Sequence, residues 1–141
     1  MRAVLDTNVL VSGLMGLFTY PARVVDMLYT GRFSCVFDDR IMAEYEEVLH
    51  RPRFAAAISQ REIIDLLGYI ARRGVHVLAG PVKGTVDLAL DPDDLPFVEA
   101  AVAGRVDFII TGNLAHFSFF EGNSFGIRPV SPHQFYEEAC R

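Results

Sequence analysis

Short apolar runs rich in β-branched and aromatic residues alternate along this chain with longer segments of helical period, and this alternation constrains the fold most. Strands separated by helices predict βαβ units and a mostly parallel sheet. We expect a three-layer α/β/α sandwich whose central sheet has about five strands. The runs expected as strands are 3–5, 34–37, 75–78, 107–110 and 127–130, and the expected helices are 21–29, 38–49, 60–73, 95–103 and one that begins at 131–132.

Length and composition narrow the class of protein further. A chain of 141 residues, of which 51% are hydrophobic and 22% charged, suffices for one globular domain, expected to span residues 1–141. No apolar run reaches the ~18–20 residues that a membrane helix needs, and Asp6 lies where a signal peptide would have its apolar stretch. We therefore expect a cytoplasmic protein in which Cys35 and Cys140 are free thiols, one buried and one near the chain end.

The net charge places a condition on any polyanionic substrate. The chain has 13 Lys and Arg residues against 18 Asp and Glu residues, a net charge of -5. As a whole it would repel nucleic acid or an anionic membrane. A substrate of that kind requires a local reversal of charge, for which a bound cation is the obvious candidate.

Two polar tripeptides follow predicted strands. They are Asp6-Thr7-Asn8, after the first strand, and Thr111-Gly112-Asn113, after the fourth. Ligands of open parallel sheets bind beyond the carboxyl ends of the strands, so Asp6 is the first candidate site residue. The same residue types favour turns and helix caps, and the tripeptide taken alone favours a turn.

The helix expected to end at residue 49 supplies a second candidate acid. Ile41 and Tyr45 lie on its apolar stripe, and Glu47 lies nearly opposite. Glu44 and Glu46 flank the two edges of the stripe. Periodicity leaves the choice between these two glutamates open.

A third group of acids, Asp91, Asp93 and Asp94, precedes the helix expected over 95–103. Asp94 would make a good N-cap, and acids suit the positive end of a helix dipole. One capping carboxylate is enough for that purpose. The surplus acids make a cation site in this loop a reasonable rival to the capping interpretation.

The electrostatic repulsion among these acids indicates what a shared site would require. Three carboxylates ~5 Å apart at an effective dielectric constant of ~20 repel by roughly 3 kcal/mol per pair, or about 10 kcal/mol in all. That rivals the whole stability of a typical domain, ~5–15 kcal/mol. If Asp6, Glu44 and Asp94 converge, they must be partly protonated or hold a cation, and carboxylate oxygens favour Mg²⁺ or Mn²⁺.

The segment 4–10, Val-Leu-Asp-Thr-Asn-Val-Leu, resembles the opening motif of one family, the PIN-domain ribonucleases, and 44–54 is similar to the segment that carries the family's second acid. Residues 91–101 and 109–117 resemble the third and fourth motifs. Each motif alone is weak, but their order and spacing agree over most of the chain.

The resemblance implies a site and a chemistry. It implies that Asp6, Glu44 and Asp94 are catalytic acids that bind Mg²⁺ or Mn²⁺, with Glu44 preferred over Glu46. It further implies that Thr111 orients the site and that two neighbours support Asp6, namely Thr7 and Asn8.

One position departs from the family pattern. The family often has a fourth acid after Thr-Gly, where this chain has Asn113. An amide oxygen still ligates a cation but removes one negative charge. We count Asn113 among the catalytic residues and expect one tightly held metal ion and a second, weaker one.

The subgroup that the chain resembles contains toxins of toxin–antitoxin pairs, similar to VapC. This similarity implies an endoribonuclease with an RNA substrate, an antitoxin protein as partner, a homodimer and no membrane association. Two other hypotheses stay open. One is a degenerate PIN domain that binds RNA or a protein without cleavage, and the other is a phospho-accepting receiver domain, which would want a lysine where the last strand leads into Arg128-Pro129.

The remaining candidates favour structural interpretations. Phe117, Phe119, Phe120 and Phe125 are expected to cover a core edge or a dimer contact rather than to stack on bases. Arg51 and Arg53, which flank Pro52, could contact phosphates, but a solvated loop is the favoured interpretation. His116 is near Asn113 in sequence and is assigned no role.

Overall fold

The computed structural model describes residues 1–82, 91–120 and 125–140 and contains a five-stranded sheet in which every pairing is parallel. The strands are β1 (Arg2–Leu5), β2 (Ser34–Phe37), β3 (Val75–His76), β4 (Phe108–Ile110) and β5 (Arg128–Val130), in the order β3-β2-β1-β4-β5. The predicted α/β class and parallel sheet are confirmed. The order differs from the flavodoxin-like order 2-1-3-4-5, which receiver domains share.

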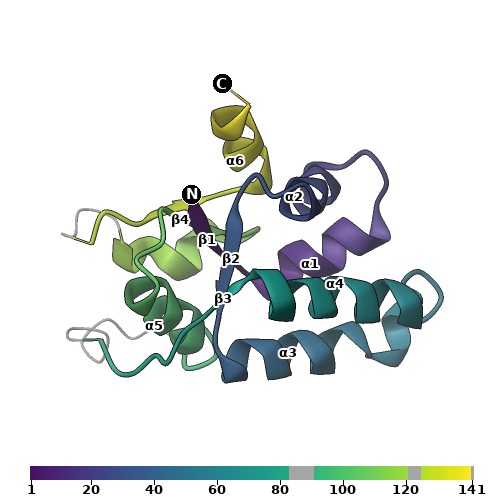
Figure 1. Ribbon diagram of the computed structural model, residues 1–141, viewed down its shortest axis with the longest axis horizontal. Helices are drawn as coiled ribbons and strands as arrows, with labels where there is room; N and C mark the ends of the chain where they lie inside the picture. The colour runs from purple at the N-terminus through teal and green to yellow at the C-terminus, as the bar shows by residue number, and fades with distance from the viewer. Residues whose placement is uncertain (83–90, 121–124, 141) are drawn as a thin grey trace.

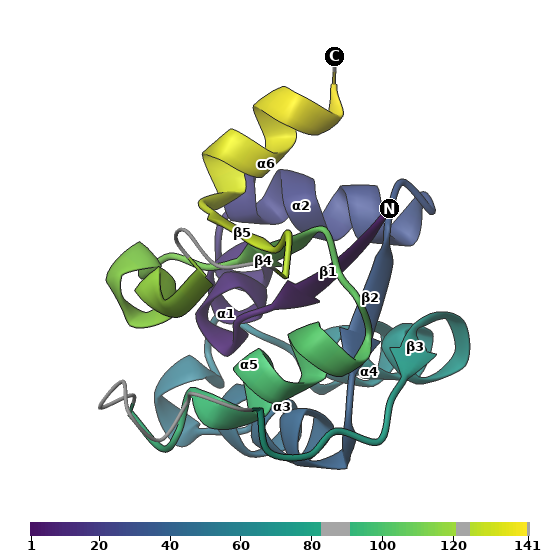
Figure 2. The same ribbon diagram turned by 90° about the vertical axis from the view of Figure 1, so that its left-hand side faces the viewer.

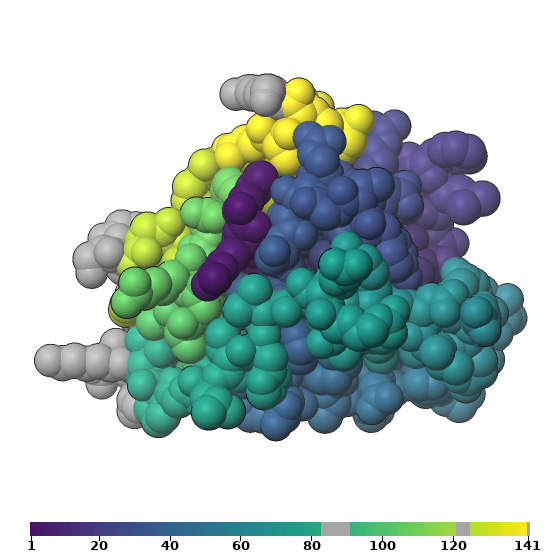
Figure 3. All heavy atoms as spheres, in the orientation of Figure 1, coloured from purple at the N-terminus to yellow at the C-terminus, as the bar shows by residue number. Residues whose placement is uncertain are grey.

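Helices cover both sides of this sheet. They are α1 (Thr7–Met15), α2 (Tyr20–Tyr29), α3 (Asp39–Leu49), α4 (Gln60–Arg73), α5 (Leu95–Ala103) and α6 (Pro132–Ala139), with short 3-10 helices at Pro52–Phe54 and Leu114–Phe120. Figure 2 shows α2 and α6 packed together above the strands, and α3, α4 and α5 below them. The structure is thus a three-layer sandwich (Figure 1). In the space-filling view, α4 and the segment after it cover the lower part of one face, and α6 lies along the top (Figure 3).

The central strand is the most deeply buried element. Ala3, Val4 and Leu5 of β1 have no exposed surface, because β1 pairs with a strand on each side and is covered on both faces. The neighbouring strands contribute fully buried Cys35, and Ile109 and Ile110. A run of apolar residues without alternation is the expected pattern for such a strand.

Side-chain caps fix the helix starts that the sequence predicts. The Asp38 carboxylate accepts from the Ile41 backbone N–H at 2.9 Å, which places the start of α3 at Asp39. Ser59 and Glu62 form a capping box at α4. Ser131 caps α6 through the Gln134 N–H at 3.1 Å.

Two predictions of secondary structure are wrong. β3 has two residues rather than the four expected over 75–78. The second error concerns α1, since the chain continues from Asp6 directly into a helix rather than a turn. Helix α1 contains Gly13, where a Cβ would lie 2.6 Å from Val25 Cγ2 and 2.9 Å from the Pro21 carbonyl oxygen. Its packing against α2, rather than residue propensity, therefore stabilises α1.

The expectations for the cysteines and for part of the phenylalanine cluster are confirmed. Cys35 is buried and Cys140 is exposed, and both are free thiols, as predicted. Phe117 and Phe120 are in the core, which agrees with the structural interpretation of that cluster. No helix in residues 1–82, 91–120 or 125–140 is long and apolar enough to span a bilayer.

Candidate active site

Three acids that are far apart in sequence line one pocket of about 410 Å³. Asp6 comes from the end of β1, Glu44 from α3, and Asp94 from the turn before α5. The pocket lies beyond the carboxyl end of β1, where open parallel sheets bind ligands. Its other lining residues are Thr7, Asn8, Val11, Ser12, Val48, Arg51, Arg53, Phe54, Asp91, Asp93, Asn113 and His116.

Asp6 is held by residues at the end of β4 and at the start of α1. Its backbone N–H donates to the Ile110 carbonyl at 2.9 Å, and its Oδ2 accepts from the hydroxyl of fully buried Thr111 at 2.7 Å. Asn8 Nδ2 lies 3.4 Å from the same oxygen. Burial raises the pKa of Asp6, and the hydrogen bond from Thr111 partly opposes that rise.

Glu44 is the glutamate of α3 that lines the pocket. Its Oε2 accepts a hydrogen bond from the hydroxyl of Thr7. Thr7 therefore contacts Glu44 through its side chain, and it supports Asp6, as we expected, through a backbone hydrogen bond. Burial raises the pKa of Glu44, the Thr7 hydrogen bond opposes the rise, and the charge of Asp6 adds to it. Glu46 is exposed, and Glu47 is paired with Arg51.

Asp94 does not cap α5, and the capping interpretation of this residue is wrong. It occupies the N-cap position, but its side chain makes no capping hydrogen bond. Its Oδ2 instead lies 3.2 Å from Nδ1 of His116, whose Nε2 lies 2.9 Å from Nδ2 of Asn113. With the amide nitrogen donating to Nε2, the ring proton is on Nδ1 and faces Asp94.

Burial of the three acids makes a bound cation favourable at this site. Burial raises the pKa of Asp94; His116 opposes the rise, whereas Asp6 adds to it. Burial therefore makes all three acids resist ionisation, and the charge of Asp6 adds to this effect at Glu44 and Asp94. A divalent cation would remove this penalty, and the donor set of hard carboxylate oxygens suits Mg²⁺ or Mn²⁺.

The acids share a pocket but not a coordination sphere. Within the described ranges, no three His, Cys, Asp or Glu side chains converge closely enough to hold a metal ion. Asp6 and Glu44 each direct one oxygen to a hydroxyl of the pocket wall. Binding an ion would require side-chain rotation toward the centre of the pocket.

The sequence interpretation assigned no site role to four residues that line this pocket, although it considered a phosphate contact for two of them, Arg51 and Arg53. Arg51, Arg53 and Phe54 come from the turn after α3 and line the same pocket as the acids. His116, to which no role was assigned, contacts Asp94. The available signal was the proximity in sequence of Arg51 to Glu44, about two helical turns.

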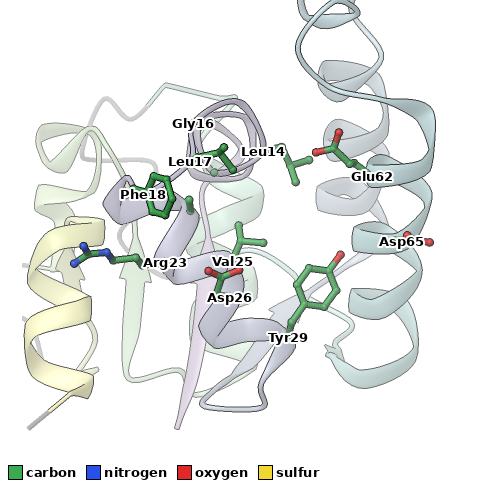
Figure 4. A pocket seen from close by; sticks show the side chains of 12 residues that line it. Leu14, Gly16, Leu17, Phe18, Arg23, Val25, Asp26, Tyr29, Glu62 and Asp65 are labelled. Atoms are coloured by element: carbon green, nitrogen blue, oxygen red, sulfur yellow. The ribbon is translucent and has the colours of Figure 1, made fainter.

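A second pocket of about 500 Å³ lies between α1, α2 and α4. Figure 4 shows Leu17 and Phe18 at the α1–α2 turn, with Tyr29 and Glu62 across the pocket. Leu17 is 85% exposed and Phe18 is 89% exposed, and Phe18 has a φ of 64°. The lining also contains Asp26, Glu62 and Asp65, whereas the exposed Leu17 and Phe18 give its rim an apolar surface.

Comparisons with known proteins identify the family and the fold of this chain. A family model described as a PIN domain matches residues 2–115. The chain is also similar to the crystal structure of VapBC2 from Rickettsia felis bound to a DNA fragment from its promoter, with a TM-score of 0.61 and 14% sequence identity over 93% of this chain and 98% of that chain. No curated protein matches the sequence.

Proposed function

The chain belongs to the PIN-domain family, and from that premise we propose that it is a metal-dependent endoribonuclease that hydrolyses RNA phosphodiesters. The observation that carries the proposal is the shared pocket of Asp6, Glu44 and Asp94, which come from three separate elements. A receiver domain does not account for this chain, because both the family and the strand order differ. We assign Asp6, Glu44 and Asp94 to binding Mg²⁺ or Mn²⁺.

The mechanism is a hydrolysis with no covalent enzyme intermediate. The metal ion, when bound, would polarise the scissile phosphate and lower the pKa of the attacking water. Thr111 fixes Asp6 from the β4 side, and Thr7 fixes Glu44 from the start of α1. His116 contacts Asp94, the third acid, through its ring nitrogen Nδ1. These hydroxyl and imidazole contacts orient the carboxylates that carry the negative charge of the site.

Asn113 supports the site rather than supplying a fourth charge. Its backbone N–H donates to Thr111 Oγ1 at 3.0 Å, and its amide nitrogen contacts His116. The amide oxygen can assist a second, weaker ion. We propose that one ion is held tightly by the three acids and that the second binds with RNA.

We extend the proposal to the biological role and to partners. VapBC2 is a complex by its description, and by analogy this chain would act as a toxin in the cytoplasm, as a homodimer with a cognate antitoxin. The exposed Leu17 and Phe18 beside the second pocket provide an apolar surface that such a partner would cover. Co-purification with the product of the neighbouring gene, lost on Phe18→Asp, tests this role.

The test of the nuclease is a pair of charge-removing substitutions. Asp6→Asn and Asp94→Asn should abolish Mn²⁺-dependent cleavage of single-stranded RNA, whereas Asp65→Asn, at an exposed position on α4, should not. Metal-free Asp6→Asn should be at least as stable as the unmodified protein, because burial disfavours the ionised Asp6 carboxylate. Unchanged cleavage in both site variants would refute the assignment.

One observation favours a second function, RNA or protein binding without cleavage. The acids do not converge on a common point within the described chain, and the fourth position is an amide. Calorimetric titration with Mn²⁺ separates the two functions. A nuclease site should show binding heat and thermal stabilisation, both lost in Asp6→Asn, and a degenerate site should show neither.

A further inference from the structure

A single short segment supplies the arginines that line the acidic pocket. Arg51 and Arg53 flank Pro52 in the turn after α3, and with Phe54 they form one wall of the pocket. The negative charges in the lining come from the carboxylates of Asp6, Glu44, Asp91, Asp93 and Asp94. The imidazole of His116 also lines the pocket.

The two arginines have different surroundings. Arg51 is engaged with Glu47 through Nε at 3.2 Å and a terminal nitrogen at 2.9 Å. The guanidinium carbon of Arg53 lies 4.7 Å from the centre of the Phe54 ring. Over residues 1–82, 91–120 and 125–140, Arg53 makes no ion pair with a carboxylate, and it is exposed. Arg53 therefore has its full charge available to an anion.

The local backbone holds this pair in place. Pro52 begins the 3-10 helix Pro52–Phe54, in which the Phe54 N–H donates to the Arg51 carbonyl at 3.0 Å. The Phe54 carbonyl in turn accepts from Ile58, a buried residue, at 2.9 Å. The Phe54 ring is half-buried against the core. A ring that is fixed on one side orders the guanidinium stacked on its other side.

We propose that Arg53, supported by the Phe54 ring, binds a backbone phosphate of the single-stranded RNA whose scissile bond lies at the acids. This inference rests on the proposed nuclease function and assigns its substrate contact. The acids repel a polyanion, so a strand that enters the pocket needs a cation that the acids do not already neutralise. An arginine suits this role because its planar guanidinium stacks on an aromatic face and donates two hydrogen bonds to one phosphate.

The test separates strand binding from metal binding and from chemistry. Arg53→Ala is compared with Arg61→Ala, an exposed arginine of α4 that lies outside the pocket. Fluorescence anisotropy in Mn²⁺ uses a short single-stranded oligoribonucleotide with phosphorothioate linkages, which resist cleavage. Arg53→Ala should weaken binding roughly tenfold, and the loss of one phosphate contact should reduce the slope of log K against log salt by ~0.7.

Two further measurements define the role of Arg53. KM for RNA cleavage should rise about tenfold while kcat stays within about twofold, because the contact is made to the bound strand and not to the reacting atoms. Mn²⁺ binding by calorimetry should be unchanged in Arg53→Ala. Phe54→Leu, which keeps an apolar side chain but removes the ring, should change KM in the same direction by about threefold.

The outcomes distinguish the two proposals. Equal oligonucleotide affinity and equal salt slope in Arg53→Ala and the unmodified protein would overturn the role of Arg53, even if cleavage is present. If the unmodified protein binds RNA but does not cleave it, the nuclease proposal fails, and the Arg53 contact is still decided by the anisotropy titration.

Discussion

Arg40 ties together the two helices that bring acids into the pocket. Its guanidinium contacts Asp38 at 2.7 Å and Glu99 at 2.8 Å, and so joins the start of α3 to α5. Helix α3 carries Glu44, and Asp94 immediately precedes α5. The two helices lie side by side in both ribbon views (Figures 1 and 2). We predict that Arg40→Met destabilises the fold and weakens the response to Mn²⁺.

The expected loss in free energy of unfolding follows from the burial of Arg40 and its two partners, Asp38 and Glu99. The Asp38 and Glu99 side chains are 7% and 9% exposed, whereas that of Arg40 is 46% exposed. Removing one partner of a buried pair costs ~3–5 kcal/mol, and the exposure of Arg40 to water reduces this to about 2–3 kcal/mol. Asp38 keeps the Ile41 N–H, so most of the loss falls on Glu99.

Urea unfolding followed by circular dichroism measures the effect, with Arg40→Met/Glu99→Met as the matched control. Replacing both partners removes the stranded carboxylate, so the double variant should recover at least half of the lost free energy of unfolding. A cost below about 0.5 kcal/mol for Arg40→Met would refute the argument, since that is the range of ordinary surface substitutions. So would a double variant less stable than Arg40→Met.

Three other predictions concern single side chains. Thr111→Val should lower the free energy of unfolding, measured in urea, by about 1–3 kcal/mol. The buried hydroxyl of Thr111 donates to Asp6 and accepts from the Asn113 N–H, and valine loses both hydrogen bonds. An unchanged free energy of unfolding would argue against these two contacts. Burial raises the pKa of Cys35 to about 12 from 9.0, so a thiol reagent at pH 8 should modify Cys140 alone in the native protein and both cysteines in urea. Because the unfolded thiol ionises first, this cysteine should also lower stability as the pH rises above 9.0. Phe18→Asn should leave stability unchanged or raise it by about 1 kcal/mol in thermal unfolding, because Phe18 has a φ of 64° and is 89% exposed; a loss of 1 kcal/mol would show that its ring contributes packing.

The fold was predictable wherever local signals agreed with long-range packing. The strands of a parallel sheet are apolar on both faces, so runs such as 3–5 and 108–110 stand out in the sequence. The caps at Ser59 and Ser131 mark helix starts for a local reason, because each hydroxyl accepts from a backbone N–H three residues later. Helix α1 was missed because Asp6-Thr7-Asn8 suits a turn as well as a helix cap, and Asp6, at the N-cap position, makes no capping hydrogen bond.

The site was predictable as a set of acids but not as a set of contacts. Asp6 could be identified from its place after a predicted strand, and Asp94 from its place before a predicted helix. The choice of Glu44 over Glu46 came from the family resemblance alone, because both glutamates flank the apolar stripe. Periodicity of one helix cannot say which edge faces a partner element, and it is the Thr7 hydroxyl of α1 that lies beside Glu44.

The charges that line the pocket predict that the metal ion binds before RNA. Five carboxylates line the pocket against two arginines, one of which is already paired with Glu47. RNA that arrives before the metal ion would meet a net negative pocket, whereas a divalent ion that arrives first would offset part of the negative charge, weaken the repulsion and leave Arg53 to hold the strand. RNA affinity should therefore depend on Mn²⁺ in the unmodified protein. In Asp6→Asn, which has one charge fewer, metal-free RNA binding should be stronger than in the unmodified protein, and anisotropy in the presence of a chelator measures this difference. Weaker metal-free binding by Asp6→Asn would contradict repulsion as the cause.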